Sequence, residues 1–298
     1  MNVCKGTLYV VATPIGNLLD ITFRAVQVLS DVDIIAAEDT RHSKILLNHY
    51  NITSPTVSCH KFNEKGRVGY FIDELLSGKN IALISDAGTP SISDPGGILL
   101  AEAVRCGITI TPVSGPSAVA AAVSASGFLA DSFVFLGFLP KKEKQLIAYL
   151  NEAFTSRPIV FYESPKRIVK TMNIMAVNFP NSQVSLCNDL TKKFEKIYRG
   201  TPSEVLEALK ENPAHEKGEY TCVALTEDKH MVMQNAQNPF DTSITLEARL
   251  VDIMVSRGCS LKEAAETLYI NANKKIRKKD IYNASLRLKN ILSQTISH

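Results

Sequence analysis

Short apolar runs alternate with amphipathic segments along residues 7–225. Uninterrupted apolar runs such as Thr7–Thr13, Val32–Ala37 and Ile81–Ser85 are typical of strands buried on both faces, as in parallel sheets. Apolar residues three and four positions apart at 22–30 and 68–76 indicate amphipathic helices between those strands. This alternation predicts an α/β fold.

The same pattern divides this region into two parts. In the first part we expect further strands at 56–58 and 108–113 and further helices at 43–48 and 98–105. In the second we expect helices at 118–126, 141–154, 168–177 and 204–211 (the last capped by Ser203), and strands at 133–138, 158–162, 184–186, 196–199 and 220–225. A boundary near Val113–Ser117 gives an N-terminal α/β domain at 1–115 and a second α/β domain at 116–230, with a cleft between them.

The last part of the chain changes character. Residues 226–242 are polar and lack periodicity, as expected of a linker. Residues 244–292 show three helical patterns: one at Leu246, Leu250 and Ile253, one after a Ser260 cap, and one that follows the basic run KKIRKK. They predict a small all-helical C-terminal domain. Together with its linker, this domain covers residues 231–298, and its layout resembles a helix-turn-helix unit.

Composition places the chain among ordinary globular proteins. Of its 298 residues 45% are apolar and 21% are charged, and no apolar stretch reaches the ~18 residues that span a bilayer. The N-terminus runs directly into a strand pattern and lacks the layout of a signal peptide. The six cysteines are scattered without a C-x-x-C pair, so we expect reduced thiols and a cytoplasmic protein without a zinc site.

Charge is unevenly distributed although the net charge is only +3. Residues 1–240 carry 23 Lys/Arg and 24 Asp/Glu, whereas residues 241–298 carry 10 and 6. A basic tail on a neutral body favours a polyanionic partner such as RNA. On charge alone, a solvated helical face is an equally good interpretation.

Polar and Gly/Pro-rich clusters follow several expected strands, where α/β proteins bind ligands. In the first domain they are Pro14-Ile15-Gly16-Asn17, Glu38-Asp39-Thr40-Arg41 and the loop of Asn80–Gly97; in the second they are Glu163-Ser164-Pro165 and Asp189-Leu190-Thr191-Lys192. The Gly and Pro residues let the main chain press against a flat ligand, whereas the carboxylates can bind hydroxyls or a cation.

Common nucleotide and hydrolase motifs are absent from the sequence. It has no G-x-x-x-x-G-K-[ST] and no G-x-G-x-x-G after the first strand, which disfavours a P-loop enzyme and a Rossmann dinucleotide site. It has no G-x-S-x-G elbow, and its six histidines lack metal-ligand spacing. The residues alone therefore predict a two-domain α/β enzyme with an interdomain cleft and a tail suited to nucleic acid.

Several motifs in order resemble one family over essentially the whole chain. They are TLYVVATPIGNLLDITFRA, AAEDTR, LISDAGTPSISDPG, PVSGPSA, GFLP, FYESPKR and LTKKFEKIYRG. The chain resembles the ribosomal RNA small subunit methyltransferase I family, within the tetrapyrrole methylase superfamily. The resemblance implies a cytoplasmic homodimer that uses S-adenosylmethionine, without a metal or a membrane, to methylate the ribose 2′-oxygen of cytidine 1402 in 16S rRNA of the small ribosomal subunit.

The resemblance also implies a donor site between the two α/β domains. The expected donor-binding residues of the first domain are Pro14, Ala87, Gly88, Thr89 and Ile92. Those of the second are Leu129, Ala130, Glu163, Cys187, Asn188 and Thr221. Superfamily members often have Gly-Asp-Pro where this chain has Gly88-Thr89-Pro90, which leaves the role of Thr89 open.

Removal of the ribose proton needs a polar group, because a ribose hydroxyl is a poor acid. The candidates are Glu38, Asp39, Glu163, Asp189, Lys192 and Glu195, and each can instead be a structural ion pair or helix cap. We favour Asp189, Lys192 and Glu195, with Glu163 facing donor or ribose, because the Leu-Thr-Lys segment resembles the RNA-methylating members. The expected phosphate-binding residues are Arg41, Lys61, Lys166, Arg167, Lys274, Lys275, Arg277, Lys278 and Lys279.

Two other functions remain open at this point. One is a small-molecule C-methyltransferase of the tetrapyrrole type, against which the basic tail and the Leu-Thr-Lys segment argue. The other is an RNA-binding assembly factor without catalytic activity that keeps the fold. A measurement of S-adenosylmethionine binding distinguishes this second alternative from an enzyme, because the absence of donor binding would support a non-catalytic factor.

Overall fold

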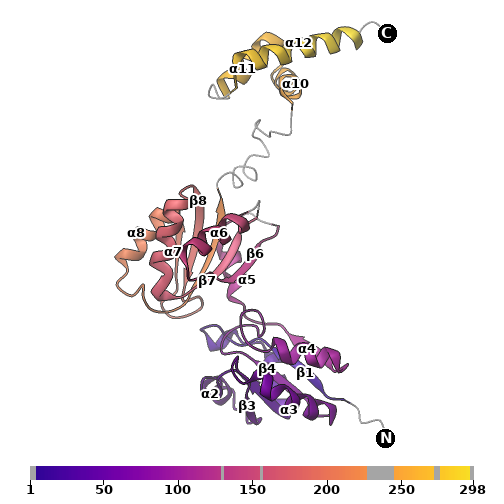
Figure 1. Cartoon of the computed structure of the whole chain (residues 1–298), viewed down its shortest axis with the longest axis vertical. Helices are drawn as coiled ribbons and strands as arrows, with labels where there is room; N and C mark the ends of the chain where they lie inside the picture. Colours follow the sequence, from indigo (N-terminus) through magenta and orange to yellow (C-terminus); the bar gives the residue numbers. More distant parts are fainter. Residues whose placement is uncertain (1–4, 129–130, 155–156, 227–244, 272–275, 296–298) are drawn as a thin grey trace. The chain divides into compact units, whose positions relative to one another are not determined.

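The structure, a computed structural model, describes residues 5–128, 131–154, 157–226, 245–271 and 276–295. The chain forms two compact units, Met1–His230 and Met231–His298 (Figure 1). The expected linker at 226–242 lies almost entirely outside the described residues.

Unit 1 contains two sheets of five strands. The first has the order β3-β2-β4-β1-β5, and every described pairing in it is parallel. Its strands are β1 (Thr7–Val11), β2 (Ile34–Ala37), β3 (Thr56–Ser58), β4 (Ile81–Ile84) and β5 (Thr109–Val113). Every residue of β2 and β4 is buried, which explains their uninterrupted apolar sequence.

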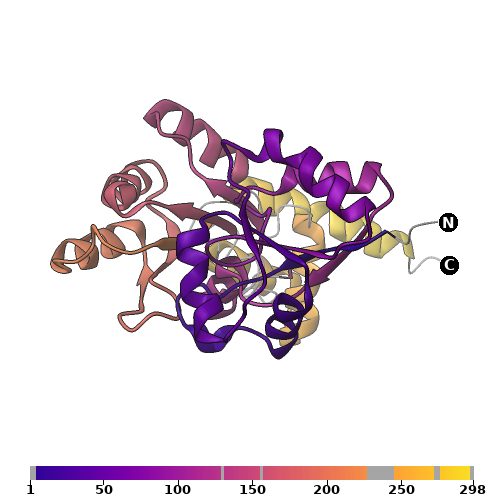
Figure 2. The same cartoon turned by 90° about the horizontal axis from the view of Figure 1, so that it is seen from below.

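Helices cover both faces of this first sheet (Figure 2). Alternate strand residues point to opposite faces, so Leu83 packs with Phe71 and Leu99, whereas Ile84 packs with Leu29 and other residues of the opposite face. The helices are α1 (Phe23–Asp31), α2 (Thr40–His49), α3 (Glu64–Leu76) and α4 (Gly97–Arg105), and a 3-10 turn, η1 (Leu18–Asp20), precedes α1. The sheet is therefore a doubly covered α/β layer.

The second sheet is mixed, with the order β6-β7-β10-β8-β9. Its strands are β6 (Val134–Phe138), β7 (Ile159–Glu163), β8 (Ser182–Asn188), β9 (Lys196–Gly200) and β10 (Tyr220–Thr226). Only β6 and β7 pair in parallel among the described pairings, since β10 runs antiparallel to β7 and β8, and β9 antiparallel to β8. Because β8 and β10 are buried on both faces, their apolar runs resemble those of a parallel sheet.

Four helices pack against the second sheet. One face is covered by α6 (Glu143–Ala153), α7 (Pro165–Asn178) and α8 (Pro202–Glu211), and α7 lies beside α8 (Figure 1). The other face is covered by α5 (Ala118–Ser126), whose small side chains let Val119 and Ala122 approach Val160 and Val223. The small-residue helix expected at 118–126 thus forms with those bounds.

Several helix starts differ from the sequence predictions, and the largest difference is at α3, which begins at Glu64 rather than at 68. The expected cap Ser203 is wrong, because Thr201 caps α8 in a capping box with Glu204 and Pro202 takes the first helical position. Helix α2 starts at Thr40 rather than at 43, because the Asp39 carboxylate accepts a hydrogen bond from the Arg41 N–H. Helix α7 starts at Pro165 rather than at 168, again with proline in the first turn.

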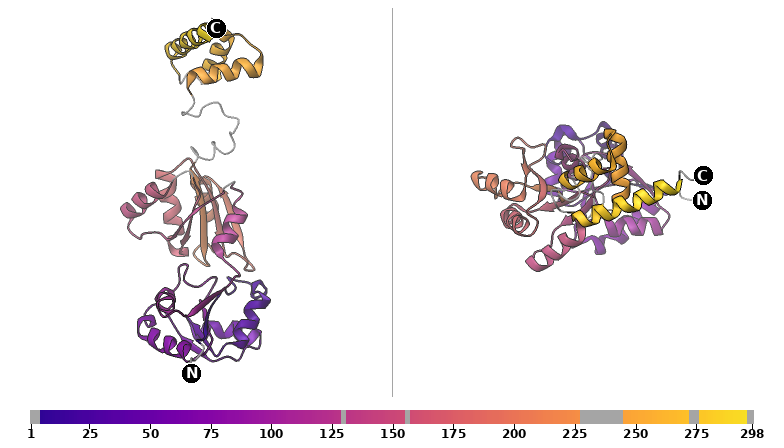
Figure 3. Two further views of the ribbon diagram at one scale, coloured as in Figure 1. Left: turned by 90° about the vertical axis from the view of Figure 1, so that its right-hand side faces the viewer. Right: turned by 90° about the horizontal axis from the view of Figure 1, so that it is seen from above.

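The described part of unit 2 consists of three helices around one small core (Figure 3). They are α10 (Leu246–Arg257), α11 (Leu261–Asn271) and α12 (Lys278–Thr295). Buried Leu250, Leu268 and Leu288 hold them together. Ser260 forms a reciprocal cap with Glu263 at the start of α11, as its position before the apolar pattern predicts.

Candidate active site

The carboxyl ends of β1, β2 and β4 lie at one edge of the first sheet, because these strands run in parallel. The loops after β1 and β4 are joined by a two-residue antiparallel bridge between Thr13 and Gly88, with N–H···O distances of 2.9 and 3.0 Å. Gly88 has φ +83°, a conformation that favours glycine. The loop of Asn80–Gly97 is therefore shaped by backbone contacts.

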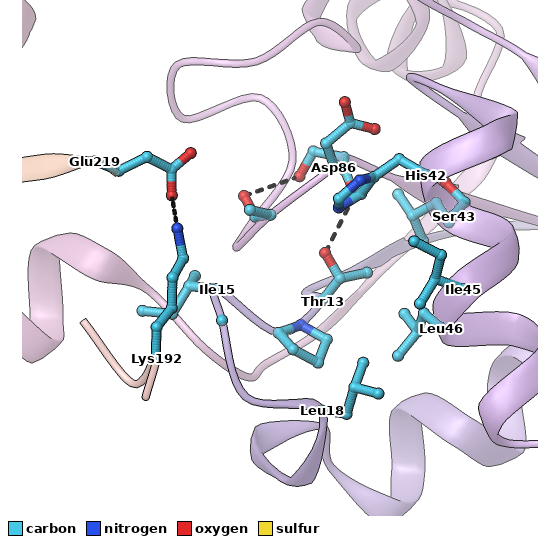
Figure 4. A pocket seen from close by; sticks show the side chains of 15 residues that line it. Thr13, Ile15, Leu18, His42, Ser43, Ile45, Leu46, Asp86, Lys192 and Glu219 are labelled. Carbon is cyan, nitrogen blue, oxygen red and sulfur yellow. Dashed lines mark hydrogen bonds and ion pairs between the residues drawn. The ribbon is translucent and has the colours of Figure 1, made fainter. Parts of the chain in front are cut away.

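A cavity of about 470 Å³ opens beside this bridge (Figure 4). Thr13, Leu18, His42 and Asp86 of the first sheet's loops and helices line it on one side, whereas Lys192 closes it from the second sheet's loops. Figure 4 shows Lys192 joined by an ion pair to Glu219, next to Ile15. The cavity therefore lies between residues of both sheets.

A second cavity of about 260 Å³ shares four lining residues with the first. The shared residues are Ile15, Asp86, Ala87 and Glu219. The second cavity is further lined by Glu38, Gly88, Thr89, Ile92, Ser93, Asp94, Ser117, Ala118, Phe138, Tyr162, Glu163, Tyr220 and Thr221. Each sheet with its covering helices forms one lobe of unit 1, and the two cavities form one cleft, which we call the interlobe cleft.

The second cavity is strongly acidic. Its lining includes five carboxylates and no Lys, Arg or His among the described residues; the five are Glu38, Asp86, Asp94, Glu163 and Glu219. Burial, together with neighbouring carboxylates, raises the pKa values of Glu38 and Asp94 above their ordinary range. Burial also raises the pKa of Tyr162 to about 12, so its hydroxyl stays protonated. This arrangement suits a positively charged ligand.

Lys192 is held by two carboxylates at the edge of the cleft. Its Nζ lies 2.9 Å from Asp189 Oδ1 and 2.9 Å from Glu219 Oε2. Partial burial alone would lower the pKa of Lys192, but hydrogen bonds to Asp189 and Glu219 outweigh burial and the net pKa is raised. Lys192 is therefore an ammonium ion throughout the physiological pH range.

The loop that carries Lys192 has a strained backbone. Asp189 and Thr191 have φ of 51° and 66°, which non-glycine residues seldom adopt. Glu195 lies in the same loop, and its carboxylate accepts a hydrogen bond of 2.6 Å from the Thr191 N–H. A side chain at Gly218 would collide with the Asp189 carboxylate. Several local constraints thus fix the position of Lys192.

The structure brings most of the expected donor-binding residues together. Pro14 lines the first cavity, and Ala87, Gly88, Thr89, Ile92, Glu163 and Thr221 line the second. Cys187 and Asn188 lie at the end of β8, buried and outside the described cavity lining. Leu129 and Ala130 lie outside the described residues.

Glu163 lines the second cavity, but its carboxylate has several partners within the second sheet's own lobe. It accepts hydrogen bonds of 2.8 Å from the Ser164 N–H and 2.8 Å from the Thr171 hydroxyl. Arg167 lies 3.2 Å from it and also donates to the carbonyls of Leu139 and Pro140. Arg167 thus contributes charge balance and packing, and most of its donors already have acceptors.

The remaining expected phosphate ligands are mostly exposed. Arg41 makes a two-pronged ion pair with Asp39, which lowers the pKa of that carboxyl, whereas Lys61 and Lys166 are exposed. In unit 2, Arg277 pairs with Asp280 at 2.9 Å, and Lys278 and Lys279 are exposed. Lys274 and Lys275 lie outside the described residues.

Sequence reasoning missed Glu219, Asp94, Tyr162 and Phe138 of the cleft. Glu219 immediately precedes β10, and its pairing with Lys192 depends on β10 lying beside β8. Asp94 lies in the Gly/Pro-rich loop, where its carboxylate was a detectable signal. Phe138 and Tyr162 have ring centroids 5.5 Å apart and form an apolar wall that only the pairing of β6 with β7 creates.

Among the described residues, no group of three or more His, Cys, Asp or Glu is arranged to hold a metal ion. Within the same ranges, no helix has the length and apolarity needed to cross a membrane.

Comparisons with known proteins agree on the fold. The chain is similar to cobalt precorrin-4 methyltransferase, with a TM-score of 0.55, 20% identity and coverage of 74% of this chain and 94% of that one. It is also similar to a diphthine synthase, with a TM-score of 0.56, 13% identity and coverage of 74% and 90%. At these identities the likeness concerns the fold alone.

Sequence comparisons are more specific. The family described as tetrapyrrole (corrin/porphyrin) methylases matches residues 7–206. A protein of Halalkalibacterium halodurans named ribosomal RNA small subunit methyltransferase I is 40% identical over 284 residues, 94% of each chain. A protein of the same name from Vibrio cholerae is 47% identical over 214 residues, covering 71% of this chain and 74% of its own. The chain therefore belongs to the ribosomal RNA small subunit methyltransferase I family of the tetrapyrrole methylases.

Proposed function

We propose that this protein transfers a methyl group to the ribose 2′-oxygen of cytidine 1402 in 16S rRNA of the small ribosomal subunit. Family membership supports methyl transfer to ribosomal RNA, because relatives at 40–47% identity carry that name. The methyl-transfer chemistry is supported by one observation above all: the interlobe cleft is acidic, and the ammonium group of Lys192 lies at its edge.

The methyl donor is S-adenosylmethionine, and the chemistry of the cleft fits it. When bound, the donor supplies a methyl group activated by a positively charged sulfur, so its transfer needs chiefly alignment. The carboxylates of Glu38, Asp86 and Asp94 match that positive charge. Gly88 leaves its backbone uncovered by a side chain, and its φ of +83° is a conformation that favours glycine.

The two lobes would hold different parts of the donor. From the first lobe, Ala87, Gly88 and Thr89 present backbone and a hydroxyl, and Ile92 adds apolar surface. From the second, Thr221 adds a hydroxyl, whereas Phe138 and Tyr162 provide apolar aromatic surface against which a nucleobase can pack. Cys187 and Asn188 lie at the end of β8, opposite Thr221 and Tyr220 of β10, and Cys187 belongs to the apolar cluster against which Tyr162 packs.

Lys192 does not remove the ribose proton, because its raised pKa keeps it protonated. We assign to it the stabilisation of negative charge that develops on the ribose oxygen during transfer. Asp189 is a positioning residue, since it holds Lys192 and is not among the cavity-lining residues. Glu195 positions the same loop through the Thr191 N–H.

Glu219 is the carboxylate best placed to accept the proton. It lines both cavities and contacts the Lys192 ammonium, and its side chain is 72% exposed, which leaves it accessible to a ribose. In the reaction the hydroxyl O–H proton passes to the Glu219 carboxylate as the oxygen–methyl bond forms and the sulfur–methyl bond breaks. Glu163, buried with Thr171 and Arg167, contributes negative charge to the cleft wall.

The test is a tritiated-methyl assay with small ribosomal subunits and with naked 16S rRNA. We expect label in rRNA at one nucleotide whose 3′ phosphodiester resists alkali, because a 2′-O-methyl group blocks alkaline cleavage. Label on a base, in a nucleotide whose 3′ phosphodiester is cleaved by alkali, would overturn the 2′-oxygen assignment. Label in a tetrapyrrole but not in rRNA would favour small-molecule methylation, and failure to bind the donor in calorimetry would favour a non-catalytic assembly factor.

Two further properties belong to the same proposal. We propose a homodimer that acts in the cytoplasm, where small subunits are assembled. Sedimentation at micromolar concentration should then give twice the mass of 32.7 kDa, and a monomer that is fully active would contradict the dimer. Fractionation should place the protein with free small subunits in the soluble extract.

A further inference from the structure

Unit 2 has a groove between α11 and α12 with a volume of about 680 Å³. Its floor is apolar, from Leu261, Ala265 and Ile281. The residues along each wall recur at helical spacing, so each helix presents one continuous face to the groove. On α11 these are Leu261, Lys262, Ala265, Glu266 and Tyr269, and on α12 they are Lys278, Ile281, Tyr282, Ser285 and Lys289.

The rim of the groove is positively charged. It carries Lys262, Lys278 and Lys289 against a single carboxylate, Glu266. Within the described ranges, no carboxylate lies within ion-pair distance of these three lysines. By contrast, two arginines of this unit, Arg277 and Arg287, are each paired with a carboxylate, Asp280 and Glu247. The groove therefore concentrates the unpaired positive charge of this surface.

Two tyrosines accompany the lysines. Tyr282 is 63% exposed, so its ring is accessible from solvent at the groove. The Lys278 ammonium lies 4.9 Å from the centroid of the Tyr269 ring, a cation–π contact that fixes both groups at the groove. An aromatic ring beside cations at a concave apolar surface is the combination that binds nucleobases together with their phosphates.

We infer that this groove binds a single-stranded segment of RNA, with a base stacked on Tyr282 and phosphates at Lys262 and Lys289. The inference rests on the proposed function, which supplies RNA as the substrate. A single strand is favoured over a duplex because paired bases do not expose their flat faces. The groove residues differ from the basic run KKIRKK at 274–279, which overlaps the start of α12, and only Lys278 belongs to both.

The test uses the full-length protein and a fluorescein-labelled 12-nucleotide single-stranded RNA, with fluorescence anisotropy as the readout. Tyr282→Ala should weaken binding about 10-fold, as expected for loss of one stacked base, and Tyr282→Phe should bind like the unaltered protein. Lys289→Ala should reduce the affinity. It should also reduce the magnitude of the slope of log affinity against log salt concentration by about one, because one phosphate contact is lost. Because Tyr282 and Lys289 are exposed, the variants should keep their thermal unfolding temperature.

Lys65→Ala is the control, since it removes one exposed charge of α3, which lies outside the groove. An equal loss of affinity for Lys65→Ala and Lys289→Ala would overturn the groove in favour of diffuse attraction. Equal binding of a duplex of the same sequence, or competition by polyglutamate as strong as by RNA, would also overturn it. A change in sedimentation without a change in RNA affinity would identify a second protein copy as the occupant instead.

The same variants separate this inference from the proposed function. Methyl transfer to small subunits by the unaltered protein, with normal RNA affinity of Tyr282→Ala, would overturn the groove and leave the function standing. RNA binding that depends on Tyr282, without methyl transfer by the unaltered protein, would overturn the function and leave the groove standing. A 4-thiouridine-substituted RNA should cross-link to α12 at Tyr282, as mapped by mass spectrometry.

Discussion

Replacing Gly16 by alanine should displace Lys192 without altering its chemistry. Gly16 lies in the loop after β1, and a Cβ at this position would collide with Lys192 Cγ. It would also lie 3.0 Å from the Leu190 carbonyl oxygen and 3.0 Å from Thr191 Oγ1, closer than ordinary contacts. Because the contact with Lys192 Cγ is the shortest of the three, and the Leu190 oxygen belongs to the backbone, we expect the Lys192 side chain to move.

The expected effect on methyl transfer is large. A displacement of ~1 Å at a reacting group costs about 100-fold in rate, or about 2.7 kcal/mol of transition-state stabilisation. The added methyl group also crowds the hydrogen bond of 3.1 Å from the Asn17 N–H to Thr191 Oγ1. Overpacking of this kind costs ~1–3 kcal/mol of folding stability, which a protein of this size can tolerate.

The assay combines kcat on small ribosomal subunits, donor affinity by calorimetry, and the midpoint of thermal unfolding. We expect a fall in kcat of about 100-fold with near-normal donor affinity, because Gly16 lines only the first cavity. Gly69→Ala is the control: Gly69 lies on the exposed face of α3, where a Cβ meets nothing within 4 Å. A folded Gly16→Ala protein with normal kcat would refute the role assigned to Lys192.

Three further predictions concern the same cleft. Lys192→Ala should abolish methyl transfer and leave donor binding intact; near-normal turnover would remove Lys192 from the mechanism. Gly218→Ala should lower kcat with little change in donor affinity, because its side chain would push Asp189 away from Lys192, and an unchanged kcat in a folded protein would contradict that contact. Donor affinity, measured by calorimetry between pH 7.5 and 5, should fall as the pH is lowered. Burial raises the pKa values of Glu38 and Asp94, so these carboxylates take up protons at a higher pH than ordinary carboxyl groups. Each protonation removes a negative charge that attracts the positively charged donor. The double variant Glu38→Gln, Asp94→Asn should bind more weakly at pH 7.5 and lose that pH dependence; an unchanged dependence would assign it to other groups.

The sequence predicts the strands of the first sheet well, because the pattern there is local. Apolar runs at β2 and β4 are buried on both faces, and the polar residues that follow them, such as Glu38 and Asp86, line the cleft. Helix α2 begins earlier than its apolar pattern indicates, because Asp39 caps it with its side chain. Capping adds polar residues to a helix start, which hydrophobic periodicity alone does not detect.

Strand direction in the second sheet could not be predicted from the same signal. The runs at β8 and β10 are buried on both faces, so an antiparallel pair there has the same apolar sequence as a parallel one. Glu219 was missed for a related reason. Its partner Lys192 lies 27 residues earlier in the chain, and the pairing requires the β10–β8 register that places Tyr220 opposite Asn188.

The position of Lys192 depends on backbone features of three separate segments. Gly16 leaves room for its side chain, Gly218 leaves room for the Asp189 carboxylate that binds it, and Asp189 and Thr191 adopt positive φ to turn the loop. Positive φ costs of order 1–3 kcal/mol at each non-glycine residue, a cost that proteins tolerate chiefly at functional sites. An exposed ion pair for stability alone would return at most ~1 kcal/mol, less than the strain of this loop. The arrangement is therefore better explained by a requirement to hold one ammonium ion at a fixed place beside the acidic cleft, where charge develops on the substrate oxygen.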